Sequence, residues 1–493
     1  MRGFSFSNEK FIPLNFFIAH TPSVMENSIS EWKQRYLELE KHYAQLLEKL
    51  GQLKARIVVL EAENQTLKER LNTNSTNSSK PPSQDPSRTK RDSTPSGKTP
   101  GGQPGHPGHT RQLYPPEKVS KTVDVKPTVC PSCSTGNFEN MPIAVEIRQV
   151  IDLPEIPPDV TQYNVHTCKC CRCGKHVRAD IPKEAERGFG PRLMGFVTML
   201  TGEGQLTKRK ICAIAAHLGL KISLGALCNI HKLASELLAA PSETIQKFVL
   251  QQEGLNADES GWRVQQKRCW IWIGATPTAT FFRIDPARSS AAYRRIFGNF
   301  NGILNTDRHG AYNEHEGKKQ SCLAHIDRHF AKMSERLGVD GSCGRLLEAQ
   351  LDSIFGLWGE FKRRSFSREI LQQKATEHIE NVRAILIFTT REAKSNQSKA
   401  LAHDLLDRFS TLWTFLSVEG VEPTNNLAER GLRPAVVFRK ISGGNQSEWG
   451  ARFTERLMTV VCTLKQNTRN VFTFFTEIFA FHCKAGPPPK SVI

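Results

Sequence analysis

The chain has 493 residues, too many for one hydrophobic core, and 67 Lys and Arg against 49 Asp and Glu give it a formal net charge of +18. The basic residues cluster in linkers and beside motifs, which favours a polyanionic partner, nucleic acid first, over a purely solubilising role. No apolar run approaches the roughly 18 residues that a membrane helix needs, which argues against a membrane-spanning protein.

Residues 1–24 are expected to form a disordered or extended start. The segment FIPLNFFIAH is a poor signal peptide, because Pro13 and Asn15 interrupt it and no cleavage site follows. Met1 and Met25 are both candidate start residues.

A heptad repeat predicts a leucine-zipper coiled coil over residues 25–73. Its d positions hold leucine five times in succession, at Leu39, Leu46, Leu53, Leu60 and Leu67. Its a positions are Tyr36, Tyr43, Leu50, Ile57, Asn64 and Leu71. Asn64 favours a two-stranded, in-register pair. A single amphipathic helix packed on its own protein is the alternative, but the narrow apolar stripe with charged flanks favours a homodimer or higher homo-oligomer.

Residues 74–115 are rich in Ser, Pro, Gly, Lys and Arg, and they have no apolar period. This composition predicts a disordered basic linker that touches phosphates without reading sequence.

Residues 116–188 predict a small β zinc ribbon that binds DNA. Two C-x-x-C pairs about forty residues apart are its expected ligands, Cys130 with Cys133 and Cys170 with Cys173. Gly174 favours the second pair, although Cys168 with Cys171 has the same spacing. Between the pairs, VEIRQVIDLPEI and VTQYNVHT alternate like strands. The 13 cysteines in so long a chain indicate structural Zn²⁺ in a reducing compartment, rather than disulfides or unligated buried thiols.

Residues 189–250 have a helical period and predict a helix, a turn and a second helix. Gly219 would end the first helix and Ser223 would cap the second. The basic residues Lys208, Arg209 and Lys210 at the start suit a DNA-binding helix-turn-helix. Plain core helices fit the same pattern nearly as well.

Residues 251–482 predict an α/β domain with a helical insertion at about residues 344–420. Three strand candidates, GLNADES, CWIWIGA and ATFFRI, precede the helix PARSSAAYRRIFGNF and the strand GILNTD. This order matches a ribonuclease-H-like fold, in which Asp258 and Asp307 lie on adjacent central strands. The whole chain is thus expected to be a multidomain α+β and α/β protein, with residues 483–493 as a tail.

Three carboxylates, Asp258, Asp307 and Glu429, are the candidate catalytic groups. Each has a simpler explanation: Asp258 ends a strand beside Glu259, an alternative ligand, and Asp307 caps a turn. Asn426 and Glu429 have the spacing of a helix capping box. Together, carboxylates from two strand ends and one helix are what a two-metal phosphoryl-transfer site requires, and Mg²⁺ prefers such oxygen ligands.

The motifs NADES, LNTDRHGAY, CLAHIDRHF, TNNLAERGLRP and RKISGG, in this order, resemble the catalytic half of the insertion-sequence-66 family of bacterial transposases. The resemblance runs from about the coiled coil to the last helices. It implies that Asp258, Asp307 and Glu429 form an acidic triad for Mg²⁺ or Mn²⁺ in an enzyme that cuts element ends and joins the 3′-OH to target DNA. Many members have Asp where this chain has Thr424, so no carboxylate is available there.

The resemblance also implies terminal inverted repeats and target DNA as partners, element-encoded accessory proteins as further candidates, and a cytoplasmic, nucleoid-associated location. Basic residues after the last acid would hold DNA phosphates, namely Arg430, Arg433, Arg439 and Lys440. Helix surface charge is the alternative for any one of them. Two other functions remain open: a non-catalytic, zinc-dependent DNA-binding regulator derived from a transposase, and a plain metal-dependent nuclease.

Overall fold

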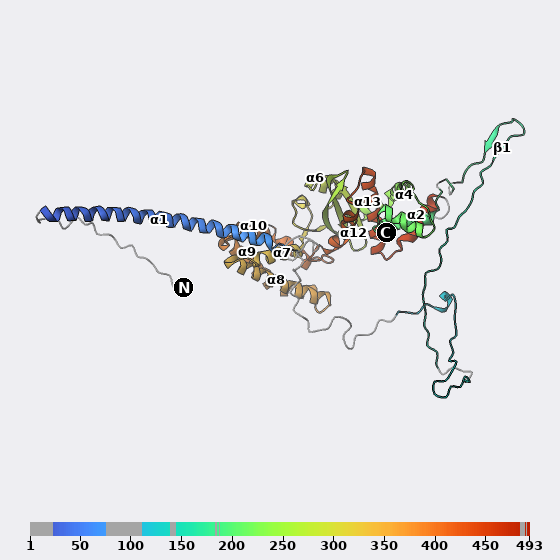
Figure 1. Ribbon diagram of the computed structural model, residues 1–493, viewed down its shortest axis with the longest axis horizontal. Helices are drawn as coiled ribbons and strands as arrows, with labels where there is room; N and C mark the ends of the chain where they lie inside the picture. Colours follow the sequence, from blue (N-terminus) through green and yellow to red (C-terminus); the bar gives the residue numbers. More distant parts are fainter. Residues whose placement is uncertain are drawn as a thin grey trace.

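The computed structural model describes residues 23–74, 111–138, 144–182, 185–186, 188–483, 489 and 491–493. The expectations for residues 1–22, for linker residues 75–110 and for most of the tail lie outside these described residues. Figure 1 shows a long helix, α1, that projects from the body of the molecule, and an extended arm that carries β1.

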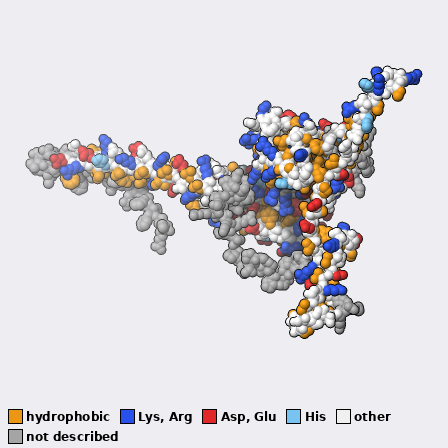
Figure 2. Space-filling model, turned by 45° about the vertical axis from the view of Figure 1, so that its right-hand side comes forward, with side chains coloured by type: hydrophobic (Ala, Val, Ile, Leu, Met, Phe, Trp, Pro, Cys, Tyr) orange, Lys and Arg blue, Asp and Glu red, His pale blue; other side chains and the backbone are white. Residues whose placement is uncertain are grey.

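Helix α1 (Ser23–Leu71) is continuous over 49 residues, so the predicted zipper segment is helical. Its d-position leucines are exposed, from 46% at Leu60 to 66% at Leu39. Hydrophobic side chains line one side of this helix in Figure 2. The alternative in which this stripe packs on the chain's own body is therefore wrong, and the stripe is free to pair with another helix.

The C-terminal end of α1 is anchored to the body by a buried ion pair. Arg336, which precedes α8 (Gly338–Lys362), donates to the Glu69 carboxylate through Nε at 2.8 Å and Nη2 at 3.2 Å. The same guanidinium donates to Ser395 Oγ at 2.8 Å and to Gln397 Oε1 at 2.6 Å, at the start of α10 (Asn396–Asp407). Because Arg336 is only 7% exposed, this bidentate contact fixes the direction in which α1 leaves the body.

The segment predicted as a zinc ribbon is an extended arm with little regular structure. It contains η2 (Pro116–Lys118) and an antiparallel hairpin of β1 (Thr167–Lys169) and β2 (His176–Arg178). The strands predicted at residues 145–156 and 160–167 are absent, apart from Thr167 at the start of β1, so that prediction is wrong. Pro154, Pro157 and Pro158 cannot donate ladder hydrogen bonds, and a hairpin of two short strands offers no sheet to extend.

The predicted helix-turn-helix lies in a module of four helices, which are α2 (Pro191–Gly202), α3 (Lys208–His217), α4 (Leu224–Leu237) and α5 (Ala239–Leu250). Thr207 Oγ1 accepts from the Lys210 N–H and caps α3, and Ser223 Oγ accepts from the Ala226 N–H and caps α4. Gly219 in the turn has a φ of +72°, which glycine adopts without strain. The local prediction of helix, turn and helix is thus confirmed.

One mixed five-stranded sheet, with the order β5-β4-β3-β6-β7, forms the centre of the body. Its strands are β3 (Gly254–Val264), β4 (Lys267–Ala275), β5 (Thr280–Asp285), β6 (Ile303–Thr306) and β7 (Lys319–Ser321). The first three are antiparallel, whereas β6 runs parallel to β3 and β7 runs parallel to β6. Helix α6 (Ser290–Phe297) forms the crossover that the parallel connection from β5 to β6 requires.

A helical insertion follows β7 and α7 (Leu323–Ser334). After α8 it contains α9 (Arg368–Glu392), α10, η4 (Phe409–Leu412) and α11 (Thr414–Ser417). Its helices share a separate hydrophobic core that includes Leu347, Leu351, Leu371, Leu386 and Leu405. The predicted start near residue 344 falls inside α8, which begins at Gly338.

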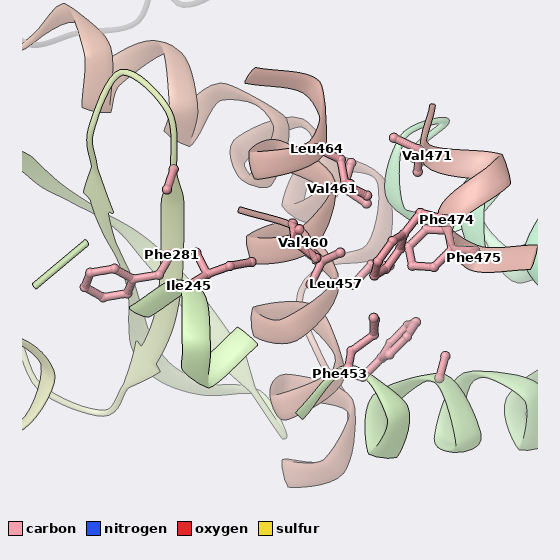
Figure 3. Close-up of a cluster of buried hydrophobic side chains, with 14 of the residues drawn as sticks. Ile245, Phe281, Phe453, Leu457, Val460, Val461, Leu464, Val471, Phe474 and Phe475 are labelled. Carbon is pink, nitrogen blue, oxygen red and sulfur yellow. The ribbon is translucent and has the colours of Figure 1, made fainter. Parts of the chain in front are cut away.

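The last three helices are α12 (Asn426–Ser442), α13 (Glu448–Gln466) and α14 (Val471–His482). Figure 3 shows Leu457 and Val460 of α13 in a buried cluster with Phe474 and Phe475 of α14. Helix α13 also covers the edge strand β5, because Thr459 and Thr463 accept from backbone N–H groups of that strand. None of the helices in the described part of the chain has the length and apolar character to cross a membrane.

Candidate active site

Asp258 and Asp307 are delivered by neighbouring parallel strands. The β3–β6 ladder pairs Asn256 with Asn305, and each aspartate follows its asparagine by two residues. Side chains alternate along a strand, so in β3 Asp258 and Asn256 share a face. Asp307 comes directly after β6, at the same level of the sheet. The predicted juxtaposition of these two acids is therefore present.

The start of α12 is fixed to the same strands by asparagine side chains. Asn425 is fully buried, and its Nδ2 donates to the Ala257 carbonyl at 2.7 Å. Its Oδ1 accepts from Asn256 Nδ2 at 3.0 Å. Asn305 Nδ2 donates to the Thr424 carbonyl at 3.1 Å. These bonds bring the first turn of α12 to the point where β3 and β6 deliver their aspartates.

Glu429 lies on that first turn, and the capping-box explanation for it is wrong. Asn425, not Asn426, precedes the helix, and no side chain caps it. Glu429 Oε1 is buried without a hydrogen-bond partner among the described residues, while His325 Nδ1 and Arg328 Nη2 lie 3.6 and 3.8 Å away. A buried polar atom without a partner is costly, so this oxygen indicates a place for a ligand.

The three carboxylates interact electrostatically. Burial raises the pKa of Asp258 well above its usual range, and the negative charges of Glu259, Asp307 and Glu429 raise it further. Such mutual repulsion means that the acids converge, and a divalent cation would relieve it. Carboxylate oxygens are ligands that Mg²⁺ and Mn²⁺ accept, so the residues present fit such an ion.

Glu259, the alternative ligand, is engaged elsewhere. Its side chain is buried, and it accepts hydrogen bonds from the Tyr312 hydroxyl and from Arg288 Nε. Arg288 Nη2 also lies 3.7 Å from Asp307 Oδ2. The turn-capping role considered for Asp307 is present as well, because its Oδ1 accepts from the His309 N–H at 2.9 Å. Glu259 therefore positions Arg288 beside Asp307, and both of its carboxylate oxygens already accept hydrogen bonds.

A second group of metal-ligand atoms shares Glu429. Cys322 Sγ, a His325 ring nitrogen and a Glu429 oxygen all lie within 4.8 Å of one another. Burial raises the pKa of the Cys322 thiol to about 11, and burial lowers the pKa of His325. The thiol is therefore protonated near neutral pH, and it accepts from the Asn425 N–H at 3.2 Å. Cys322 thus supports the start of α12.

Sequence reasoning missed the residues that hold the acids in place. Asn256, Asn305, Asn425 and Arg288 carry this role, and they act across the fold rather than along the chain. A signal was available for two of them, because Asn-x-Asp occurs in both strands, as NAD at β3 and NTD at β6. Arg288 has no such signal.

The basic residues predicted beside Glu429 differ in their surroundings. Arg430, Arg433 and Lys440 are exposed on α12. Arg439 instead donates to Ser260 Oγ at 3.2 Å and to the Gly261 carbonyl. The guanidinium of Arg439 therefore ties α12 to β3.

The basic residues predicted in the helix-turn-helix lie at the start of α3. Arg209 and Lys210 are exposed. Lys208 Nζ donates to Cys228 Sγ at 3.1 Å and lies 5.6 Å from the ring of Trp449. Lys208 thus packs within the body, while its two neighbours remain accessible.

The two predicted zinc pairs form matching turns. The Cys130 N–H donates to the Thr135 carbonyl at 2.8 Å, and the Cys170 N–H donates to the Lys175 carbonyl at 2.7 Å. In each turn the backbone N–H of the second cysteine lowers the pKa of the first, Cys130 or Cys170. This correspondence favours Cys170 over Cys168 as the start of the second pair. The four sulfurs do not gather into one metal-sized cluster within the described residues.

Comparisons with known proteins give two family matches. A family model described as Transposase IS66 family matches residues 188–453, and a model of a family of unknown function matches residues 26–112. Two similar proteins come from Sinorhizobium fredii, and both are named uncharacterized. Protein y4qI is 26% identical over an alignment of 232 residues, and the match covers 41% of this chain and 41% of its own length. Protein y4jD is 24% identical over an alignment of 185 residues, and the match covers 35% of this chain and 36% of its own length. The match thus spans about two fifths of each relative.

Proposed function

The chain belongs to the IS66 family of transposases, and from this membership we propose that it cuts DNA at insertion-sequence ends and joins the exposed 3′-OH to target DNA. The observation that carries the proposal is the convergence of Asp258, Asp307 and Glu429, with a buried Glu429 oxygen that has no hydrogen-bond partner in the described part of the chain. The sheet order, with three antiparallel strands followed by two parallel ones, supports a ribonuclease-H-like catalytic domain.

The chemistry proposed for this site is two-metal phosphoryl transfer. Mg²⁺ or Mn²⁺ held by the three carboxylates would activate the attacking oxygen and stabilise the leaving oxygen. Asn425 and Asn305 hold the acid-bearing elements in register. Arg288 and Arg328, beside Asp307 and Glu429, supply positive charge that orients a phosphodiester. No side chain needs to form a covalent intermediate, so none is assigned as a nucleophile.

The other parts of the chain suit a DNA-processing assembly. The exposed leucine stripe of α1 would pair two copies of the chain. Arg209, Lys210, Arg430 and Arg433 are exposed cations that would hold DNA phosphates. The cysteine turns of the arm would bind structural Zn²⁺ and, with the helix-turn-helix, would hold the terminal inverted repeats.

The test is strand transfer by purified protein with Mg²⁺ on labelled candidate end DNA, with and without neighbouring element-encoded proteins. Wild type is expected to give joined products, whereas Asp307→Ala and Glu429→Ala are expected to bind the DNA without cutting or joining it. Cleavage without joined products would favour a plain nuclease. Binding without cleavage by wild type, even with accessory proteins present, would favour a regulator.

A further inference from the structure

We propose that the cavity beside Asp307 is a binding site for one backbone phosphate of the DNA strand, next to the phosphate that is cut. The cavity has a volume of about 260 Å³ and lies between the end of β6, strand β7 and the end of α10. This inference rests on the proposed function, and it adds a substrate-binding subsite to the catalytic centre.

The cavity joins the catalytic sheet to the helical insertion. Asp307 and His309 form the wall toward the active site, and Lys319 and Ser321 come from β7. Arg408 closes the opposite wall from the insertion. Because Asp307 belongs both to this wall and to the acidic triad, a strand held at the triad passes directly by the cavity. Consecutive phosphates on one strand of B-DNA are only about 3.4 Å apart along the helix axis.

Of the three cations at this place, Arg308, Arg408 and Lys319, only the two arginines have a paired carboxylate among the described residues. Arg308 and Arg408 both bond to one carboxylate, that of Asp404. Lys319 makes no ion pair within the described part of the chain, and its Nζ donates to the Asn313 carbonyl at 3.0 Å. Burial lowers the pKa of Lys319, and the charge of Arg408 lowers it further. An ammonium without a counter-ion, half-buried beside two guanidinium groups that share one carboxylate, is a setting in which an anion is bound favourably.

The acids around the cavity do not cancel this preference. Asp407 is exposed at the rim. Asp307 would carry a divalent cation in the active complex, which neutralises its charge. The Ser321 and Thr411 hydroxyls lie 2.8 Å from each other on its wall, and Thr411 Oγ1 donates to the Arg408 carbonyl at 2.7 Å, so they hold Arg408 beside β7. A phosphate group matches this group of cations.

The experiment combines a charge-neutralising variant with DNA that lacks one charge. Lys319→Gln is compared with Lys318→Gln, an exposed neighbour that removes the same charge outside the cavity lining. Binding is measured with Ca²⁺ in place of Mg²⁺, so that the acids carry a divalent cation while the DNA stays uncut, on a set of end DNAs, each with a single neutral methylphosphonate near the cut. Lys319→Gln is expected to weaken binding roughly tenfold, a difference of about 1.4 kcal/mol. The slope of log K against log salt is expected to become shallower by about 0.9.

One methylphosphonate position, adjacent to the scissile phosphate, is expected to weaken wild type but to cause no further loss in Lys319→Gln. Lys319→Arg, which keeps the charge, is expected to restore most of the affinity. The proposal is overturned if Lys319→Gln and Lys318→Gln bind DNA with the same affinity. It is also overturned if the loss of binding free energy caused by Lys319→Gln adds to the loss caused by the methylphosphonate at every position. It is also overturned if inorganic phosphate binds at Lys319 without competing with DNA. Cleavage by the wild-type protein with Mg²⁺ is measured separately. If the wild-type protein does not cut but the Lys319 variants change DNA binding as expected, only the proposed transposition is contradicted.

Discussion

Asn425 connects the start of α12 to the catalytic sheet through two side-chain hydrogen bonds. Its side-chain amide donates to the Ala257 carbonyl and accepts from the Asn256 side chain, and the residue is fully buried. Glu429 lies on the first turn of the same helix. A small displacement of α12 would therefore move Glu429 relative to Asp258 and Asp307.

Replacing Asn425 with Ala is expected to lower the DNA cleavage rate roughly 100-fold, because misplacement of a reacting group by about 1 Å has that effect. It is also expected to destabilise the fold by about 1–3 kcal/mol, since the Ala257 carbonyl loses its partner. DNA affinity should change little. Single-turnover cleavage and equilibrium unfolding measure the two effects. Asn426→Ala is the control, because Asn426 is exposed and caps nothing; an equal loss there would restore the capping-box explanation.

The three candidate catalytic acids could be predicted from the sequence, whereas the residues that position them could not. Asp258 and Asp307 stand out because each ends a predicted strand, and Glu429 stands out through the ordered motifs around it. Asn425 bonds to Ala257 across 168 residues, and Asn305 bonds to Thr424 across 119. Such partners are fixed by the packing of α12 on the sheet, which no local pattern reveals.

Glu455 on α13 is a buried acid outside the active site. Its side chain accepts from the Ile284 N–H on β5, and burial raises its pKa to about 7 from the usual 4.5. The folded state therefore binds more protons than the unfolded state between these two pH values. Its contribution to stability is thus most favourable below about pH 4.5 and is lost as the pH rises toward 7.

Glu455→Gln keeps an oxygen that can accept from Ile284 and removes the titration. The variant is expected to gain stability relative to wild type as the pH rises from about 4.5 to about 7, by ~3 kcal/mol in total. Urea unfolding followed by tryptophan fluorescence across this pH range measures the difference. Glu448→Gln, on the exposed face of the same helix, should show no such trend. If the difference in unfolding free energy between wild type and Glu455→Gln stayed constant across this pH range, Glu455 would not titrate there.

At the level of secondary structure, the helices of the helix-turn-helix agree with their sequence-based prediction better than the strands of the arm do. Helices α3 and α4 carry their own caps at Thr207 and Ser223, so local chemistry defines their starts. Strands need partners, and the segments at residues 145–156 and 160–166 alternate correctly without any strand to pair with. Alternating apolar and polar residues predict which side chains would share a face of a strand. The segment becomes a strand only where the edge of another strand is available for pairing.

The cysteine turns of the arm give a prediction about zinc register. The turns at Cys130 and Cys170 share the same backbone hydrogen bond, so Cys133 and Cys173 are the expected second ligands. Purified protein is expected to carry one Zn²⁺ per chain that Cys173→Ser abolishes and Cys171→Ser leaves in place. Metal content by mass spectrometry decides this. Retention of zinc by Cys173→Ser together with its loss from Cys171→Ser would assign the Cys168 register instead.

At the scale of the whole molecule, α1 exposes an apolar stripe that one chain alone does not cover. Leu46 and Leu53 are 63% and 62% exposed, and burying such a side chain stabilises by about 1.5–3 kcal/mol. The Glu69–Arg336 contact fixes this helix to the insertion. Pairing of two α1 helices would therefore set the separation of two catalytic domains.

The double variant Leu46→Asp with Leu53→Asp is expected to convert the protein from a dimer to a monomer, because two charges would be buried in the paired stripe. Light scattering after size exclusion gives the mass directly. Lys41→Asp with Gln52→Asp introduces two aspartates away from the a and d positions and should leave the dimer intact. A wild-type protein with the mass of one chain at micromolar concentration would contradict the zipper.

The central claim is that Asp258, Asp307 and Glu429 act as one metal-dependent centre. The most direct measurement is single-turnover cleavage of end DNA with Mg²⁺ by Asp258→Asn, Asp307→Asn and Glu429→Gln, with DNA binding measured in parallel. Each variant is expected to bind DNA as wild type does and to lose more than the roughly 10–100-fold activity that an outer-shell change costs. Glu448→Gln, an exposed position at the start of α13, should cut normally. Cleavage by Glu429→Gln at the wild-type rate would contradict the account, because α12 would then supply no ligand.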